Sequence, residues 1–242
     1  MRSKMILNTL ARFLRPAPSH PRPAALQERF ESWRTLPSVS SSQTVYDSRI
    51  VVLDVETSGL NLKKDRLIAI GAVAIVQGRI MLDDTFDIVL RQEQVSSKSN
   101  ILIHGIAGGK QRSGTDPAEA LMQFLEYIGT DPLVAFHVAF DQSMLEKSLK
   151  AWLQTDLKKR QWIDLAYLAP ALLREQALNH RTLDDWMRLF KIQNHRRHNA
   201  VADALATAEL FLCINKKCEQ KGWGKLHSLS TAERQYRQIL GQ

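Results

Sequence analysis

Cysteine is scarce in this chain, and long apolar runs are absent. Cys213 and Cys218 are the two cysteines among 242 residues, and their spacing fits neither a disulfide framework nor a common zinc motif. No stretch approaches the roughly 20 apolar residues that a membrane span requires. The basic beginning has only a short, broken apolar segment, unlike a secretory signal, although an organelle transit peptide remains an alternative. The expected location is the cytoplasm.

Proline is rare outside the first 37 residues, where five of the eight prolines occur. Residues 1–48 also contain seven Lys and Arg residues against three acids, so they supply +4 of the net charge of +8. Such a density of prolines breaks regular structure. We expect a basic, Pro/Ser-rich arm over residues 1–48, with one short helix at 24–33 that Phe30 and Trp33 could dock on the main domain.

The overall charge favours a polyanionic partner. A net charge of +8 and a sequence pI of about 9.6 suit nucleic acid or an anionic membrane surface, and charge alone does not choose between them. The hydrophobic fraction of 44% is ordinary for a globular domain with a buried core. The arm could bind nucleic acid, contact a protein partner or be cleaved.

After residue 48 the apolar pattern predicts strands first and then alternating helices and strands. The turn at residues 77–79 favours a hairpin, and Asp116 is expected to cap a helix that Pro117 begins and Glu119 supports through a capping box. The predicted strands cover residues 50–53, 67–76, 80–90, 133–136 and 161–165. The predicted helices cover 117–128, the stretch ending at 149, and three pieces within 166–218.

This order of elements predicts an α/β fold with a mixed five-stranded sheet flanked by helices. The sheet domain is expected to cover residues 49–215. A basic tail, also expected to be helical, would follow over residues 216–242.

Acidic residues occur where the predicted strands end. Asp54 and Glu56 are two apart on a strand, so their side chains project to the same side. A hard cation such as Mg²⁺ or Mn²⁺ would relieve their repulsion. Asp141 follows the fourth strand and would join them if the first and fourth strands are neighbours. Taken singly, each acid also fits an ordinary role at a strand end or in the first turn of a helix.

A third polar cluster lies near residue 200. Asn199 is expected to cap a helix, with His198 ahead of it and Asp203 on its second turn. A histidine beside acids and a metal can act as a general base near neutral pH, although a solvated loop histidine is the common alternative.

Taken together, these segments resemble the DEDDh exonucleases of the DnaQ-like family, including the exonuclease domain of DNA polymerase III epsilon. The resemblance covers about residues 49–212, and His198 rather than a tyrosine indicates the DEDDh branch. The segments that carry it read DVETSGL at 54–60, IHGI at 103–106, HVAFD at 137–141 and HNAVADA at 198–204. One position departs from the pattern, because Val138 stands where the family usually has asparagine.

The resemblance implies an RNase H-like fold and hydrolysis of nucleic acid from the 3′ end with two Mg²⁺ or Mn²⁺ ions. The implied metal ligands are Asp54, Glu56, Asp141 and Asp203, with His198 as the base and a nucleoside 5′-monophosphate as the product. The implied substrate-binding residues are Thr57, Gly59, Leu60, His104 and Phe140. Asp164 is interpreted as structural. Four arginines could contact phosphates, and a solvated face is the alternative for them: Arg181, Arg188, Arg196 and Arg197.

Three other functions stay open on the sequence. A single-stranded DNA end is the favoured substrate, but an RNA-trimming enzyme has the same motifs. A polymerase proofreading subunit is possible, although no polymerase-binding segment is evident after residue 212. A catalytically dead, nucleic-acid-binding relative is disfavoured because the five catalytic positions are intact.

Overall fold

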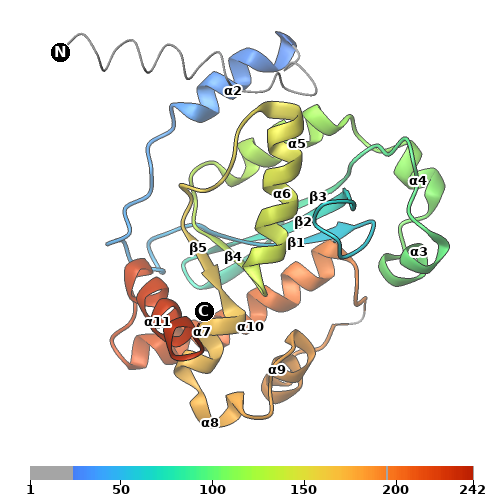
Figure 1. The fold of residues 1–242 in the computed structure, drawn as a ribbon. Coiled ribbons are helices and arrows are strands. Elements are labelled where there is room, and N and C mark those ends of the chain that lie inside the picture. The colour runs from blue at the N-terminus through green and yellow to red at the C-terminus, as the bar shows by residue number, and fades with distance from the viewer. Residues whose placement is uncertain (1–23, 195, 242) are drawn as a thin grey trace.

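The computed structural model describes residues 24–194 and 196–241, and it contains one five-stranded mixed sheet (Figure 1). The spatial order of the strands is β3-β2-β1-β4-β5. The first three strands form an antiparallel meander, and β4 and β5 run parallel to β1. The predicted mixed sheet is therefore confirmed. Its strands are β1 (Ile50–Thr57), β2 (Leu67–Val76), β3 (Arg79–Val89), β4 (Leu133–Ala135) and β5 (Trp162–Asp164).

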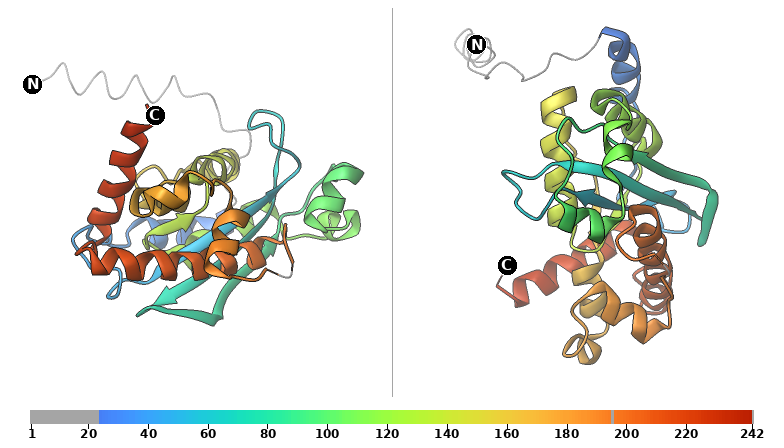
Figure 2. Two further views of the ribbon diagram at one scale, coloured as in Figure 1. Left: turned by 90° about the horizontal axis from the view of Figure 1, so that it is seen from below. Right: turned by 90° about the vertical axis from the view of Figure 1, so that its right-hand side faces the viewer.

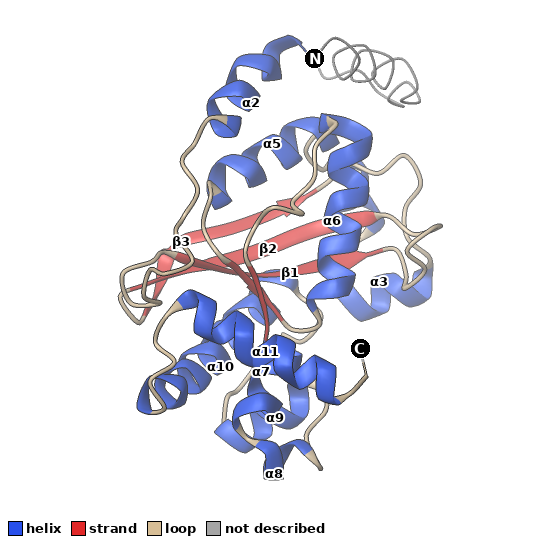
Figure 3. Ribbon diagram, turned by 60° about the vertical axis from the view of Figure 1, so that its left-hand side comes forward, coloured by secondary structure: helices blue, strands red, loops and turns tan. Residues whose placement is uncertain are grey.

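Helices cover both faces of the sheet, which Figure 2 shows nearly edge-on in its right-hand view and Figure 3 shows from another side. One layer consists of α5 (Pro117–Ile128) and α6 (Val138–Leu153). The other contains α7 (Leu165–Leu172), α8 (Arg174–Ala177), α9 (Leu183–Phe190), α10 (Ala200–Gln220) and α11 (Leu226–Ile239). The remaining described helices are η1 (Ala24–Leu26), α2 (Gln27–Arg34), α3 (Lys98–His104) and α4 (Gly108–Arg112). The described part of residues 166–218 thus forms four helices, not the three pieces expected.

The central strand β1 divides its side chains between two cores. Val51 and Leu53 belong to the core beneath α5 and α6, whereas Ile50 and Val52 belong to the core beneath α10. Side chains alternate along a strand, so the even-numbered Asp54 and Glu56 continue the row that faces α10. This alternation decides which helix can bring a further acid to them.

The short helix α2 docks on α5, as Phe30 and Trp33 predict. These two side chains are buried, and the Trp33 Nε1 donates to the carbonyl oxygen of Gly129 at 3.0 Å. Arg29 adds ion pairs to Glu119 and Glu126 at 2.8 and 2.6 Å. Within the expected arm, α2 is thus packed on α5, and the first 23 residues lie outside the described range.

The start of α5 differs in one detail from its prediction. Asp116 caps the helix by accepting from the backbone N–H of Ala118 at 3.1 Å. Glu119 does not complete a capping box, because its carboxylate accepts hydrogen bonds from Arg29 and Gln123. The Glu119 side chain that the local pattern assigned to the capping box therefore binds Arg29 of the docked helix α2 instead.

The end of the described chain is built into the domain. Helix α10 continues to Gln220, so the expected division after residue 215 falls inside it. Leu226 and Leu229 of α11 are fully buried, and the helix packs on α7. The region expected to be a helical tail contains the end of α10 and the whole of α11. None of the described helices is long and apolar enough to cross a bilayer.

Candidate active site

A cavity of about 600 Å³ opens at the carboxyl ends of β1 and β4. This is where α/β folds place their ligands. The ten residues expected at the site all line it: Asp54, Glu56, Thr57, Gly59, Leu60, His104, Phe140, Asp141, His198 and Asp203.

Three carboxylates form the centre of this cavity. Asp54 and Glu56 reach it from β1, and Asp203 reaches it from the first turn of α10. One oxygen from each lies within 4.8 Å of the others. The start of α10 is fixed by its predicted cap, since the Asn199 side chain accepts from the backbone N–H of Ala202 at 3.1 Å.

Gly71 allows α10 to approach the sheet this closely. It pairs with Asp54 in the β1–β2 register. A Cβ atom added to Gly71 would lie 2.2 Å from the carbonyl carbon of Ala200 and 2.3 Å from the backbone nitrogen of Val201. The missing side chain therefore leaves the space in which the first turn of α10 lies, and Asp203 arrives beside Asp54. Gly71 has no functional group, so nothing in the sequence marks it as part of the site.

Burial and mutual repulsion act on the carboxylates. Burial, with the nearby charges of Asp141, Glu56 and Asp203, raises the pKa of Asp54 well above its usual range. Burial and the charge of Asp203 raise the pKa of Glu56 to about 8. Both shifts show that these acids hold negative charge at a cost, which a cation would remove.

Arg197 is the cation that this structure places there. Its guanidinium pairs with Asp203, and its Nε donates to Asp184 at 2.7 Å. Asn194 and the backbone N–H of His198 also donate to the Asp203 carboxylate, at 2.5 and 3.0 Å. The sequence left a phosphate contact and a solvated face open for Arg197, and here its guanidinium neutralises part of the acidic cluster.

Asp141 lies in the cavity wall, outside the group of three. It comes from the first turn of α6, is 5% exposed, and accepts from the backbone N–H of Val55 at 3.2 Å. Burial raises its pKa to about 8, opposed by that hydrogen bond. The neighbouring strands β1 and β4 bring it to the site, as the sequence predicts.

The turn that carries Asp141 is held by Asp164. This buried carboxylate accepts from the backbone N–H groups of His137 and Val138, each at 3.0 Å, and from Arg237 of α11 at 2.9 Å. The structural interpretation of Asp164 is confirmed.

Val138 replaces a polar residue of the family with an apolar one. It is 5% exposed and belongs to the core beneath α5 and α6. Its side chain therefore packs inward, and its backbone N–H is the group that holds the turn.

Three histidines line the cavity, and the two that were expected at the site, His198 and His104, have different surroundings. His198 is exposed and has a left-handed backbone with φ of 62°. His104 is buried, and its Nδ1 accepts from the backbone N–H of Ile106 at 3.0 Å. Its Nε2 has no hydrogen-bond partner among the described residues, and burial lowers its pKa. A neutral His104 therefore presents an Nε2–H that can donate to a ligand.

Apolar side chains form the mouth of the cavity. Leu60 is 85% exposed and Ile103 is 55% exposed, although both are large hydrophobics. Such side chains can stack on the base of a nucleotide. Ile103 belongs to the IHGI segment that the resemblance includes. Four further lining residues were not expected at the site, because no local motif marks them: Asn100, Phe136, Thr182 and Leu183.

The donor set fits a divalent cation. Three carboxylate oxygens converge from two elements, and Asp141 adds a fourth acid nearby. Oxygen ligands of this kind suit Mg²⁺ and Mn²⁺, which would also remove the repulsion that raises the pKa values of Asp54 and Glu56.

The fold and the site together define an α/β nuclease of the RNase H-like class. The sequence model of the RNase_T family, described as exonuclease, matches residues 51–211, so the chain belongs to this exonuclease family. Its expected membership among the DnaQ-like exonucleases is confirmed.

Relatives and solved structures agree with this assignment. The chain is 33% identical over 172 residues to the PolC-type DNA polymerase III of Bacillus subtilis strain 168, covering 71% of this chain and 12% of that protein. The PolC-type enzyme of Thermotoga maritima is 31% identical over 192 residues, with coverages of 79% and 14%. The chain thus spans only a small part of the length of these relatives.

Two nuclease structures share the fold. Exonuclease X in complex with 5′ overhanging duplex DNA has a TM-score of 0.59 and 19% identity, covering 76% of this chain and 99% of that one. E. coli exonuclease I in complex with single-stranded DNA also has a TM-score of 0.59, with 17% identity and coverages of 71% and 41%.

Proposed function

We propose that this protein is a 3′-to-5′ exonuclease that releases nucleoside 5′-monophosphates from single-stranded DNA ends. The observation that carries the proposal is the convergence of Asp54, Glu56, Asp141, His198 and Asp203 on one cavity. These residues come from β1, α6 and the start of α10, and a binding module would gain nothing from buried carboxylates facing a phosphodiester.

The four acids would hold two Mg²⁺ or Mn²⁺ ions. Bound ions of this kind neutralise charge on the phosphodiester and on the departing 3′-oxygen. Asp203 would exchange its pairing with Arg197 for a metal ligand role. The freed guanidinium of Arg197 could then contact a substrate phosphate.

His198 would accept the proton of the attacking water. It is exposed at the cavity wall, and its backbone N–H is held by Asp203. The water oxygen forms a bond to phosphorus while the bond from phosphorus to the 3′-oxygen breaks. An unprotonated histidine near neutral pH suits this role.

The other lining residues would hold the terminal nucleotide. The Nε2–H of His104, which lacks a partner among the described residues, would donate to an oxygen of the substrate. Leu60 and Phe140 would contact the base, and the backbone of Thr57 and Gly59 would border the sugar. The Thr57 hydroxyl already braces this loop by donating to the Gly59 carbonyl at 2.8 Å.

A proofreading role is the second candidate, because the curated relatives named above are PolC-type DNA polymerases III. In that case the protein would remove mismatched 3′ ends in association with a polymerase. A primer-template with a terminal mismatch, compared with the matched primer and with single-stranded DNA, separates the two roles. Preference for the mismatched primer would favour proofreading.

The decisive test is a digestion time course. DNA and RNA oligonucleotides of one sequence, labelled at the 5′ end, are incubated with Mg²⁺, Mn²⁺ or EDTA, beside Asp203→Asn as a control. A ladder that shortens from the 3′ end, and that EDTA and the substitution abolish, is the expected result. Intact oligonucleotides under every metal condition would overturn the proposal, and faster digestion of RNA would reassign the substrate.

A further inference from the structure

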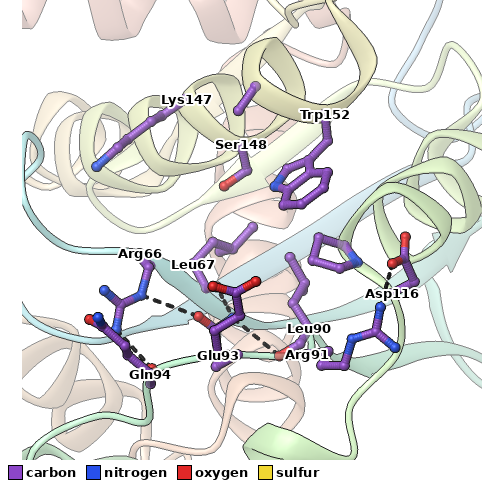
Figure 4. A pocket seen from close by; sticks show the side chains of 13 residues that line it. Arg66, Leu67, Leu90, Arg91, Glu93, Gln94, Asp116, Lys147, Ser148 and Trp152 are labelled. Carbon is purple, nitrogen blue, oxygen red and sulfur yellow. Dashed lines mark hydrogen bonds and ion pairs between the residues drawn. The ribbon is translucent and has the colours of Figure 1, made fainter. Parts of the chain in front are cut away.

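Two other cavities are lined by cationic side chains, and they differ in whether these side chains already have hydrogen-bond or ion-pair partners. The cavity in Figure 4 lies between α6 and the ends of β2 and β3, and it contains Arg66, Arg91 and Lys147. All three are engaged: Lys147 donates to three backbone carbonyls, Arg91 pairs with Asp116 at 2.6 Å, and Arg66 donates to Gln92 and Gln94. This cavity therefore offers little free positive charge.

The second cavity, of about 420 Å³, is lined by cations and hydroxyls and by no carboxylate. Its lining cations are Lys159, Arg160 and Arg234, and the imidazole of His227 lies beside them. Its lining hydroxyls are Ser38, Ser41, Thr130, Ser230 and Thr231. We call it the basic cavity.

Helix α11 supplies one wall of the basic cavity as a continuous stripe. His227, Ser230, Thr231 and Arg234 follow the three- and four-residue spacing that places side chains on one helix face. The opposite wall is tied to this helix, because the backbone N–H of His227 donates to the Ser41 carbonyl at 2.9 Å. The cavity is thus formed by packed elements.

The cations of the basic cavity have no ion-pair partner among the described residues. Among the described residues, no ion pair or side-chain hydrogen bond joins Lys159, Arg160 or Arg234 to a carboxylate. The residues outside the described range contain no aspartate or glutamate. The nearby Asp131 directs its carboxylate to Arg49 instead.

Among these cations, Arg160 gives the strongest indication of an anion-binding site. It is half-buried and stacks over the Trp33 ring at 4.8 Å, so its guanidinium has a fixed position. Burial lowers its pKa, which only the charge of Asp131 opposes. A half-buried guanidinium without an anionic hydrogen-bond partner is a group that a bound anion would satisfy.

The basic cavity lies at the far end of the sheet from the active site. Thr130 and Pro132 precede β4, and Gln161 precedes β5, whereas Asp141 follows β4. Val51 is opposite Leu133 at this end, and Glu56 is five residues along β1. At about 3.3 Å per residue, the two sites are roughly 15–20 Å apart along the sheet.

We propose that the basic cavity binds a backbone phosphate of the nucleic-acid strand, away from the site of hydrolysis. The choice of a nucleic-acid strand rests on the family and on the proposed function. A second anchor would hold a strand while its 3′ end is trimmed, and it would matter only for substrates long enough to reach both sites.

Binding without hydrolysis tests the cavity itself. Fluorescence anisotropy in EDTA measures the affinity of a single-stranded DNA of about 30 nucleotides as a function of salt. Lys159→Ala with Arg234→Ala removes two exposed cations and leaves the Arg160 stack in place. Lys216→Ala with Lys217→Ala on α10 is the matched control, since both are exposed, neither lines the cavity, and the loss of charge is equal.

The expected result is roughly tenfold weaker binding by the first double variant, with a salt slope shallower by about 1. Its hydrolysis of the p-nitrophenyl ester of thymidine 5′-monophosphate should be unchanged, because this ester cannot reach the basic cavity. Binding and slope equal to those of the control would overturn the proposal. If the wild type with Mg²⁺ hydrolyses neither the oligonucleotide nor this ester, the proposed function fails. The binding measurement in EDTA still decides whether the basic cavity binds the strand.

A free phosphate is the alternative source of the same chemistry. Titration with inorganic phosphate, followed through the NMR signals of the His227 ring, detects it. Shifts of these signals in the wild type, with oligonucleotide binding unaffected by the double variant, would overturn the strand assignment in favour of a free phosphate.

Discussion

Replacing Gly71 by alanine tests how the acidic cluster is assembled. The added Cβ would meet backbone atoms of Ala200 and Val201 at 2.2 and 2.3 Å. Ordinary contacts between carbon atoms lie near 3.5–4.0 Å, so α10 would have to move by about 1 Å or more. Backbone atoms cannot rotate away as a side chain can. The strain should therefore displace Asp203 from Asp54.

Two effects set the expected losses of stability and activity: overpacking around residue 71 and displacement of the Asp203 carboxylate. Overpacking a core typically costs about 1–3 kcal/mol. For a chain of this size that corresponds to a fall of roughly 2–12 °C in the thermal midpoint. A displacement of about 1 Å at a reacting group can lower the rate by about 100-fold. Activity should thus suffer far more than stability.

The assay compares Gly71→Ala with Gly109→Ala. Gly109 has no atom within 4 Å of an added Cβ and lacks a left-handed backbone, so its substitution should be neutral. Urea unfolding measures stability, and oligonucleotide digestion under Mg²⁺ titration measures rate and metal requirement. A Gly71→Ala protein with wild-type stability and rate would refute the close approach, and lost stability with a wild-type rate would refute the link to Asp203.

Three further predictions concern pH and structural contacts. Burial raises the folded-state pKa of Glu56 from 4.5 to about 8, so the metal-free folded protein binds more protons than the unfolded chain. The free energy of unfolding should therefore decrease from pH 5 to pH 8. Saturating Mg²⁺ should reduce this decrease, as measured by urea midpoints, and a metal-free midpoint that does not change with pH would contradict the pKa shift. Asp164→Ala should cost about 2–4 kcal/mol and slow digestion, because two backbone N–H groups, one of them buried, lose their acceptor. A cost below about 1 kcal/mol by urea unfolding would contradict this. Trp33→Ala should cost about 3 kcal/mol by the same measurement, while Tyr46→Ala, at a 55% exposed position, should change stability by less than about 0.5 kcal/mol; equal effects would argue against docking through Trp33.

Local patterns were sufficient for most elements of the fold. Alternation and apolar runs located the strands, and Asp116 and Asn199 marked the helix starts where their side chains do accept backbone hydrogen bonds. These signals are short-range, so one sequence contains them. The capping role of Glu119 failed because a distant residue, Arg29, takes its carboxylate.

The residues of the candidate site could be predicted from the sequence for a different reason. Carboxylates at strand ends, and a histidine ahead of a capped helix, are placed by local geometry, and three such motifs in order specify a family. All ten expected residues line one cavity. The roles given to them remain proposals that the digestion experiment tests.

Tertiary structure alone decided how these motifs meet. The alternation of β1 directs Asp54 and Glu56 towards α10, but only the packing of α10 over Gly71 brings Asp203 to them. The pairing of Arg197 with Asp203, the hold of Arg237 on Asp164 and the gathering of cations beside α11 join residues from separate elements. Such contacts leave no periodic trace in a sequence, because their geometry is set by how helices pack on the sheet.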